Sequence, residues 1–423
     1  MRRPVMWEVL TNSNRFGIFF VGAALSNIGT WCQNLAGILL VYRLSDSTLV
    51  VSFVTVCQFA APVILAPWGG YAADRFDRRR VLICTQLAGS VLSACLAITT
   101  MTGHVTVVGV LFMISLLGVC QAFQSPAQLS FTPLMVPPEQ RELGLSLSSS
   151  QFNIARAIGP VVANVVILKW GIGQAFLFNT FSFFAYVIAL TFFVRPFAQQ
   201  RLTAVPKLRE TIDTVRAEPL IVPLLLTGVV ISGSTDIVST LGPALSTSLT
   251  GDDGATGYFL SAFGTGAVVT AFFLVPWLRR FPRRLVWTIA AQSVGVLLMA
   301  VSPVLWLTMV GAAIMGGAFL ASSNRAVSLV QSLVPPQSLG RVMAVWLVAF
   351  LGGRPVFALL SGLVTHVASA RVAALIISLV LAASALAMLS TARRLRRLQD
   401  TTKVGTRSVD SAARPLSPSR KDT

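Results

Sequence analysis

Residues 69–80 read GGYAADRFDRRR and end a long apolar segment in a cluster of arginines. Two hundred residues later, VPWLRRFPRRL at 275–285 ends another apolar segment in the same way, with Arg75 to Arg79 aligned on Arg280 to Arg284. A second pair of stretches agrees, since LMVPPEQ at 134–140 is echoed by SLVPPQS at 332–338. Two related halves built from long apolar runs indicate a duplicated helical bundle in a membrane.

The composition supports a membrane location. Hydrophobic residues make up 54% of the 423 residues and charged residues 11%, and a soluble protein of this length cannot bury that much apolar surface. Because lipid offers no hydrogen bonds to the backbone, apolar runs long enough to cross a ~30 Å hydrocarbon core should be helices. Such runs, free of Lys, Arg, Asp and Glu, lie at 16–42, 47–73, 81–138, 285–324 and 372–392.

Hydropathy and loop charge together predict an all-α protein with twelve spans. Lys and Arg gather in the first fifteen residues, in the loops after spans two, six and eight, and in the tail, whereas the opposite loops hold Arg43, Lys169 and Arg371. This asymmetry predicts that both termini are cytoplasmic. The expected spans are 16–42, 48–70, 81–101, 105–126, 146–168, 173–194, 220–246, 255–277, 285–302, 304–328, 342–364 and 372–391.

Four regions follow from the spans. We expect a first six-helix bundle over 1–194, a cytoplasmic linker over 195–219, a second bundle over 220–391 and a basic, disordered tail over 392–423. The linker places Leu208, Ile212 and Val215 at helical spacing, which favours an amphipathic helix on the membrane surface over a solvated connection.

The net charge of +18 does not indicate nucleic acid as a partner, because the basic residues avoid the spans and no separate hydrophilic domain exists to hold DNA or RNA. Anionic membrane lipids are the expected partners of these charges. No enzyme is expected, since His104 and His366 have no nucleophile near them in sequence and a phosphate-binding loop is missing. The five cysteines match no metal motif, so we expect neither a metal nor a cofactor.

The loop at 70–79 resembles the signature G-x-x-x-D-R-x-G-R-R of the major facilitator superfamily, through Gly70, Asp74, Arg75, Arg78 and Arg79. Asp77 replaces the signature's last glycine, which fits if the turn holds Asp in a left-handed conformation. The resemblance implies two pseudo-symmetric six-helix bundles. It also implies a gate in which Asp74 faces the start of helix eleven near Gly340 and Arg341. The alternative is that the loop arginines only fix topology.

Further stretches are similar to the twelve-span efflux branch typified by the enterobactin exporter, namely GTWCQ at 29–33, QSPAQ at 124–128 and NIARAIGP at 153–160. That likeness implies a monomer in the bacterial cytoplasmic membrane that exports a bulky small molecule by proton antiport. Gly159 and Pro160 match the branch's fifth-helix motif, but Ala163 and Asn164 stand where it usually has glycine. Since 105–128 holds no arginine, the proton-coupling arrangement of the best-known drug antiporters does not transfer.

Three charges fall inside predicted spans, where each costs ~2.5–3.5 kcal/mol on insertion scales and is usually functional. Arg156 and Arg354 lie near the midplane in corresponding helices of the two halves, so they could hold an anion or could be satisfied by neighbouring polar groups. Asp236 could carry the coupling proton, pair with an arginine or sit at a wet outer mouth.

The resemblance implies that helices one, four, seven and ten line a central cavity. Polar residues in these helices could contact a substrate, although interhelical hydrogen bonding is the common role of such residues. Trp31 could add a stacking surface. Arg156 and Arg354 favour an anionic or amphipathic solute as the substrate, such as a siderophore or an antibiotic-like metabolite. A cationic drug is the alternative substrate. An importer of the same fold and a non-transporting receptor or scaffold remain the other functions. The polar candidates are Gln33, Asn34, Gln121 and Gln124.

Overall fold

The computed structural model describes residues 14–194, 220–274, 284–334 and 339–389, and these residues are almost entirely helical. The expected linker helix at 195–219 and the basic tail from 392 lie outside the described residues. The first half contains α2 (Asn14–Ser45), α3 (Thr48–Arg75), α4 (Arg78–Met101), α5 (Val107–Phe131), α6 (Arg141–Trp170) and α7 (Ile172–Ile188), which a π-helical turn extends over Ala189–Phe193.

The second half follows the same plan. It contains α9 (Ile221–Gly233), α10 (Gly242–Thr250), α11 (Thr256–Val269), α13 (Arg284–Val301), α14 (Leu305–Leu333), α15 (Leu339–Val367) and a last helix over Ala370–Leu389. α9 and α10 form one spanning segment because the π-helical stretch Ile237–Leu241 joins them. A second π-helical stretch, Thr270–Leu274, continues α11.

Ten segments in the described part of the chain are long and apolar enough to cross a membrane. The two other expected spans correspond to α2 and α11. α2 has 32 residues, but Asn27, Gln33 and Asn34 along its middle lower its hydropathy. α11 and its extension end at Leu274, where a described range ends. The order matches the twelve expected spans, and the chain is an all-α membrane protein of two six-helix bundles.

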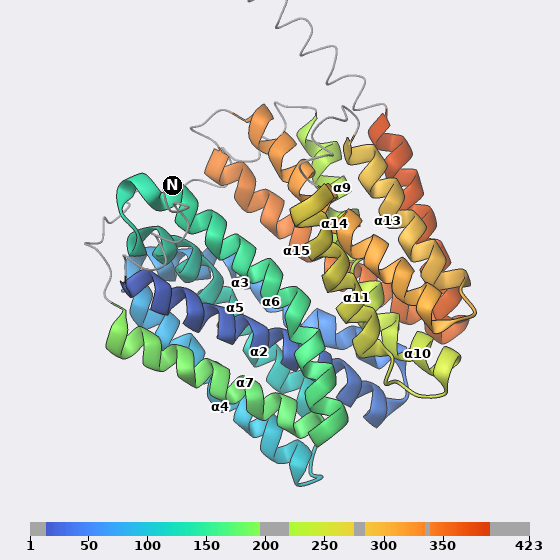
Figure 1. The fold of residues 1–423 in the computed structure, drawn as a ribbon, viewed down its shortest axis with the longest axis horizontal. Helices are drawn as coiled ribbons and strands as arrows, with labels where there is room; N and C mark the ends of the chain where they lie inside the picture. The colour runs from blue at the N-terminus through green and yellow to red at the C-terminus, as the bar shows by residue number, and fades with distance from the viewer. Residues whose placement is uncertain (1–13, 195–219, 275–283, 335–338, 390–423) are drawn as a thin grey trace, which may run out of the picture.

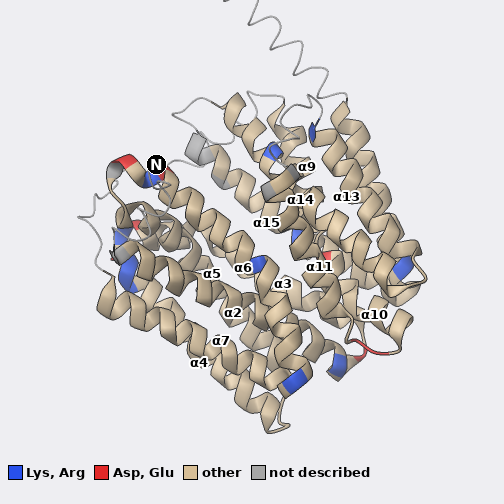
Figure 2. Ribbon diagram, in the orientation of Figure 1, with Lys and Arg blue, Asp and Glu red and all other residues tan. Residues whose placement is uncertain are grey.

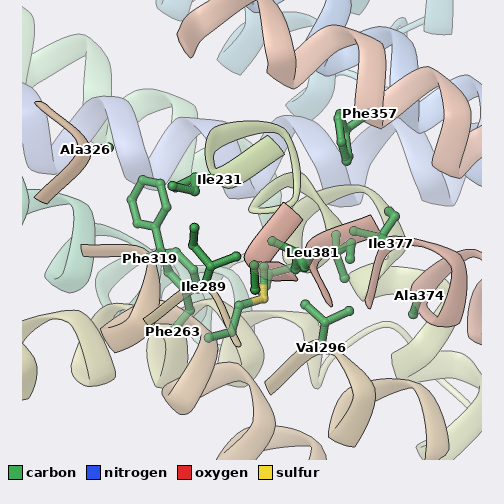
Figure 3. Packing of buried hydrophobic residues seen from close by; sticks show 14 of the residues in the cluster. Ile231, Phe263, Ile289, Val296, Phe319, Ala326, Phe357, Ala374, Ile377 and Leu381 are labelled. Carbon is green, nitrogen blue, oxygen red and sulfur yellow. The ribbon is translucent and has the colours of Figure 1, made fainter. Parts of the chain in front are cut away.

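The two bundles repeat the same internal packing. In the first half α2 packs on α6 and α3 on α5; in the second half α9 packs on α15 and α11 on α14. Polar pairs repeat as well, because Ser26 donates to Gln86 at 3.0 Å between α2 and α4, and Gln292 of α13 donates to Ser234, next to α9, at 2.8 Å. Each half also has its own hydrophobic core (Figure 3 shows part of the second one), as duplication predicts.

The bundles meet along two antiparallel helix pairs, α3 with α15 and α6 with α11. Glycine allows this close approach. A Cβ placed on Gly264 of α11 would lie 2.5 Å from the Cα atom of Ala157 in α6, and one on Gly362 of α15 would lie 3.0 Å from the Cα atom of Leu49 in α3. Side chains at these positions would push the two halves apart.

Charged residues lie mainly at the two ends of the molecule, with few along the middle of the helices (Figure 2). We call the end at which α2 begins and the last helix finishes the terminus-side end, and the other the far end (Figure 1). The terminus-side end carries the 69–80 loop, and the far end carries the turns at 46–47 and 251–255. Charges inside the bundles are therefore exceptions that need partners.

Candidate functional site

A buried ion pair joins two helical segments of the second bundle near the middle of their lengths. The Nε atom of Arg354 is 3.5 Å from the Oδ2 atom of Asp236, and Nη2 donates a 3.1 Å hydrogen bond to the hydroxyl of Thr235. Asp236 is 3% exposed and Arg354 8% exposed, so the pair is shielded from solvent. The structure thus gives Asp236 the arginine partner that was one of its three predicted roles.

Local sequence explains how Asp236 meets Arg354. α9 ends at Gly233, where a Cβ would collide with the ring of Phe357 in α15, and Gly353 of α15 lies against the backbone of Val229 in the same way. These glycines bring the two helices into direct contact. The chain then widens into the π-helical stretch Ile237–Leu241, a geometry often found at functional sites, and Asp236 stands at the break.

The first bundle contributes an aromatic ring to this pair. The guanidinium carbon of Arg354 lies 4.5 Å from the ring centre of Phe59, a buried residue of α3. The pair therefore lies at the boundary between the two bundles. No sequence pattern selected Phe59, because an apolar ring in an apolar span is ordinarily core packing.

Arg156 occupies the matching place in the first bundle. It is the sixteenth of the 30 residues of α6, as Arg354 is the sixteenth of the 29 residues of α15. Three rings surround its guanidinium carbon, at 4.6 Å for Phe319, 5.1 Å for Trp31 and 5.4 Å for Phe263. Such cation–π contacts stabilise a charge that has left water.

We call these three rings the aromatic cage of Arg156. The cage spans the two halves, because Trp31 belongs to α2, Phe263 to α11 and Phe319 to α14. Figure 3 shows Phe263 and Phe319 next to the aliphatic side chains of the second core. Phe319 also continues an aromatic row towards the terminus-side end, with Phe350 at 6.2 Å and Trp346 stacked on Phe350 at 5.9 Å. Of these rings, only Trp31 was selected from sequence.

The four predicted cavity residues separate into two groups. Gln33 is buried, and its Oε1 atom accepts hydrogen bonds from Ser93 of α4 at 2.6 Å and Asn179 of α7 at 2.9 Å, which favours the interhelical alternative. Asn34, Gln121 and Gln124 are partly exposed and make no side-chain hydrogen bond to any described residue. They remain candidates for contact with a substrate.

The signature loop binds the terminus-side ends of the first bundle together. Arg78 is buried and donates to the carbonyls of Ala73 at 3.1 Å and Ser130 at 3.5 Å. Arg79 donates to Leu190 at 2.6 Å and to Thr191, two carbonyls of the π-helical end of α7. The arginines therefore do more than fix topology, since they satisfy helix-end carbonyls of α3, α5 and α7.

The left-handed conformation expected of Asp77 is not observed. Its φ is −62° and its ψ 114°, so the turn does not hold it in a left-handed conformation. Instead, its carboxylate accepts from the amide of Arg80 at 2.9 Å and caps the start of α4. Aspartate is among the preferred residues at this position, which explains why it can stand where the signature has glycine.

The remaining loop residues face outward. Asp74 is 53% exposed and lies 4.0 Å from Nη2 of Arg78, while Arg75 lies over the ring of Tyr71 at 5.9 Å. A Cβ on Gly70 would meet nothing within 4 Å. The expected partner of Asp74 near Gly340 and Arg341 involves side chains outside the described part of the structure.

Gly159 and Pro160 of the fifth-helix motif are buried in α6. A Cβ on Gly159 would lie 3.0 Å from the carbonyl oxygen of Ile28 and closer still to the Cβ of Trp31, so glycine lets α6 pack on α2 and places Trp31 beside Arg156. Asn164, which replaces a common glycine, faces Gly257 of α11. At this contact the small residue is therefore on α11 rather than on α6.

At the far end, an ion pair joins the bundles. Arg43 of α2 donates from Nε to Asp253 Oδ2 at 2.7 Å and from Nη2 to Oδ1 at 2.9 Å, and the hydroxyls of Tyr42 and Thr247 lie 3.4 Å apart beside it. Sequence reasoning treated Arg43 only as a loop charge, because its partner is 210 residues away. Within the described ranges, no three His, Cys, Asp or Glu side chains come together to hold a metal ion.

Comparison with known proteins gives a match to a family model described as "Transmembrane secretion effector", over residues 7–413. An uncharacterised MFS-type transporter of Bacillus subtilis is 27% identical over 260 residues, covering 58% of this chain and 60% of the relative. The staphyloferrin A transporter of Staphylococcus aureus is 23% identical over 171 residues, covering 40% and 43%. Macrolide efflux protein A of Streptococcus pyogenes is 26% identical over 156 residues, covering 37% and 38%.

In each of these relatives, the matched part is less than two thirds of the relative's own length. Solved structures share the fold over most of the chain. A single-site mutant of the nucleoside transporter NupG has a TM-score of 0.72 at 14% identity, covering 89% of this chain and 100% of that one. A bacterial homologue of the human lysosomal transporter Spinster has a TM-score of 0.66 at 12% identity, covering 93% and 96%.

Proposed function

The chain belongs to the transmembrane secretion effector family of MFS-type transporters, and we propose that it exports a bulky small organic molecule by alternating access, coupled to proton antiport. One observation carries this proposal. The charged groups in the middle of the spans, Arg156, Arg354 and Asp236, are completed by side chains from both bundles. The contacts of a site shared between two halves change when the halves move against each other, as alternating access requires.

The contacts between the bundles differ at their two ends, which supports a cycle of opening and closing. The far end is joined by the Arg43–Asp253 pair. Near the terminus-side end, an added Cβ atom on Gly70 of α3 would meet nothing within 4 Å. In the proposed cycle, the opposite state would bring Asp74 to the start of α15, where exposed amide groups favour an anion.

Asp236 is the proposed proton site. A carboxylate that pairs with a buried arginine can release its partner when it takes up a proton, so that protonation and helix position become coupled. The break between α9 and α10 at this residue gives the segment a place to move. We place the protein as a monomer in the bacterial cytoplasmic membrane, with both termini cytoplasmic.

The cargo class is proposed from the relatives and the site together. Relatives named for staphyloferrin A transport and macrolide efflux support a siderophore-like or antibiotic-like molecule. The test uses everted membrane vesicles from a strain that overproduces the protein, energised to an acidic interior. Uptake of siderophores or macrolides into these vesicles that is abolished by a protonophore would support proton-coupled export.

The same preparation distinguishes the alternatives. Movement only in right-side-out vesicles would indicate an importer. No movement of any tested cargo, from well-folded protein in vesicles of either orientation, would contradict transport itself and favour a receptor or scaffold.

A further inference from the structure

The central charges do not cancel. Asp236 is engaged with Arg354 at 3.5 Å, whereas Arg156 forms no ion pair or hydrogen bond with any described residue. Arg156 and Arg354 are each the sixteenth residue of their helices, so the three groups lie at matching depth in the two bundles and are treated together as one central site. Two guanidinium groups and one carboxylate leave that site with one excess positive charge.

The rings around Arg156 restrict how this charge can be used. Phe319, Trp31 and Phe263 lie at 4.6 to 5.4 Å from the guanidinium carbon, and none of these rings carries an oxygen that could accept a hydrogen bond. The N–H groups at the edge of the guanidinium remain as donors, and a guanidinium edge matches the two oxygens of a carboxylate or of neighbouring phenolates. An anion could therefore bind without displacing the rings.

The aromatic row suits the body of such a ligand. Phe319, Phe350 and Trp346 lead from the cage towards the terminus-side end, with centre-to-centre distances of 6.2 and 5.9 Å. Phe350 is partly exposed, whereas Phe319 and Trp346 are buried, so Phe350 supplies the accessible apolar surface of this row. A planar or conjugated molecule could pack its rings there while its anionic group reached Arg156.

The same arrangement disfavours a cation. Aromatic faces are the usual binding surface for an organic cation, but here they already surround the charge of Arg156. Asp236, the carboxylate nearest to the cage among the described residues of the spans, is occupied by Arg354. A cationic ligand would meet repulsion without an available carboxylate.

We propose that the site between the bundles selects aromatic or conjugated molecules that carry a carboxylate or phenolate, and that Arg156 is the residue that recognises the negative charge. This inference rests on the proposed function and narrows its cargo class. It separates an anionic siderophore-like cargo from a cationic drug, which sequence alone left open.

The test compares three probes of nearly equal size and different charge: 1-naphthoate, 1-naphthylmethanol and 1-naphthylmethylammonium. Binding to the purified full-length protein is measured by equilibrium dialysis in nanodiscs of zwitterionic lipid, so that lipid charge does not sort the probes. We expect 1-naphthoate to bind ~10-fold more tightly than the ammonium probe. Arg156→Gln should reduce that ratio to about 2-fold or less, while the affinity for the neutral alcohol should stay unchanged.

Two further variants keep the result interpretable. Arg156→Lys retains the charge but loses the fork of donors, so naphthoate affinity should fall several-fold with the alcohol unaffected. If Arg156→Gln does not fold, Arg156→Lys alone tests whether Arg156 recognises the anion. Lys169→Gln is the matched control, because it removes one positive charge near the end of the same helix, where the exposed lysine lies over Trp170. It should leave all three affinities as they are.

The inference is overturned if wild type prefers the ammonium probe, or if the naphthoate preference survives in the Arg156 variants. Such a result would leave proton-coupled movement of cargo in everted vesicles intact, and with it the proposed function. Conversely, the charge preference could hold in nanodiscs while no cargo moves in vesicles. The proposed function would then fail although the site still bound anions.

Discussion

The ion pair at the far end allows a quantitative prediction about conformational balance. We change Arg43 to Gln, which removes both hydrogen bonds to Asp253, at 2.7 and 2.9 Å. The side chain of Arg43 is 48% exposed, which on its own indicates a weak surface pair of ~0.2–1 kcal/mol. Asp253 is only 11% exposed, however, and a buried acceptor left without its partner costs ~1–3 kcal/mol.

Because one partner is half exposed and the other mostly buried, we take about 1–2 kcal/mol as the loss, which corresponds to a factor of ~5–30 in an equilibrium constant. The pair joins α2 to the turn before α11, and in the proposed cycle it breaks when the far end opens. Arg43→Gln should therefore raise the ratio of far-end-open to far-end-closed molecules by that factor. Asp253→Asn should act in the same direction.

The assay is a distance measurement between spin labels by pulsed electron resonance. Val108, 77% exposed in the first bundle, and Ser248, exposed in the second, take the labels after the five native cysteines have been replaced. In the double variant of Arg43 and Asp253, neither charge is left unpaired, so the shift should be smaller than the sum of the single shifts. Populations that change less than about 2-fold in Arg43→Gln would refute the assigned energy.

Three other changes test the remaining contacts. Asp74→Asn should cut transport several-fold with normal membrane insertion, because the proposed gate loses its carboxylate; full vesicle transport by a well-expressed variant would contradict this. Asp236→Asn leaves the guanidinium of Arg354 buried without its ion pair, at a cost of about 3–5 kcal/mol, so the melting temperature should fall and proton-driven uptake should stop. The double change with Arg354→Gln should recover much of the stability but not the uptake; uptake that survives Asp236→Asn would remove the proton role. Gly264→Val adds a side chain whose Cβ would lie 2.5 Å from the α6 backbone, so it should abolish transport in a folded protein. Gly352→Ala is the control, because its Cβ would meet nothing within 4 Å, and its transport should equal that of wild type. Equal transport by both variants would argue against a mobile contact between α6 and α11.

The duplicated loops and the charge-free runs were enough to predict an all-α membrane protein with two six-helix bundles. The reason is energetic, since a long apolar run in lipid has to satisfy its own backbone hydrogen bonds and can do so as a helix. The same reasoning identified Arg156, Arg354 and Asp236, because a charge inside a span is costly enough to need an explanation. Trp31 was found through its place in a cavity-lining helix.

The partners of these residues could not be read from the chain. Asp236 and Arg354 are 118 residues apart, and Asp236 had three possible roles until α9 and α15 were seen to touch at Gly233. Asp77 was expected in a left-handed turn and proved to be a helix cap instead. Gln33 could have lined a cavity, but the hydroxyl of Ser93 and the amide of Asn179 occupy its oxygen.

The amino-acid sequence by itself determined where the chain crosses the membrane and which positions inside the spans carry an energetic cost, because hydropathy and charge are properties of each residue in turn. The tertiary structure alone decided what compensates that cost: a carboxylate for Arg354 and a cage of rings for Arg156. Compensation depends on distances of a few ångströms between helices far apart in the chain. Those distances are set by the packing of glycines against neighbouring helices, which no pattern along one helix encodes.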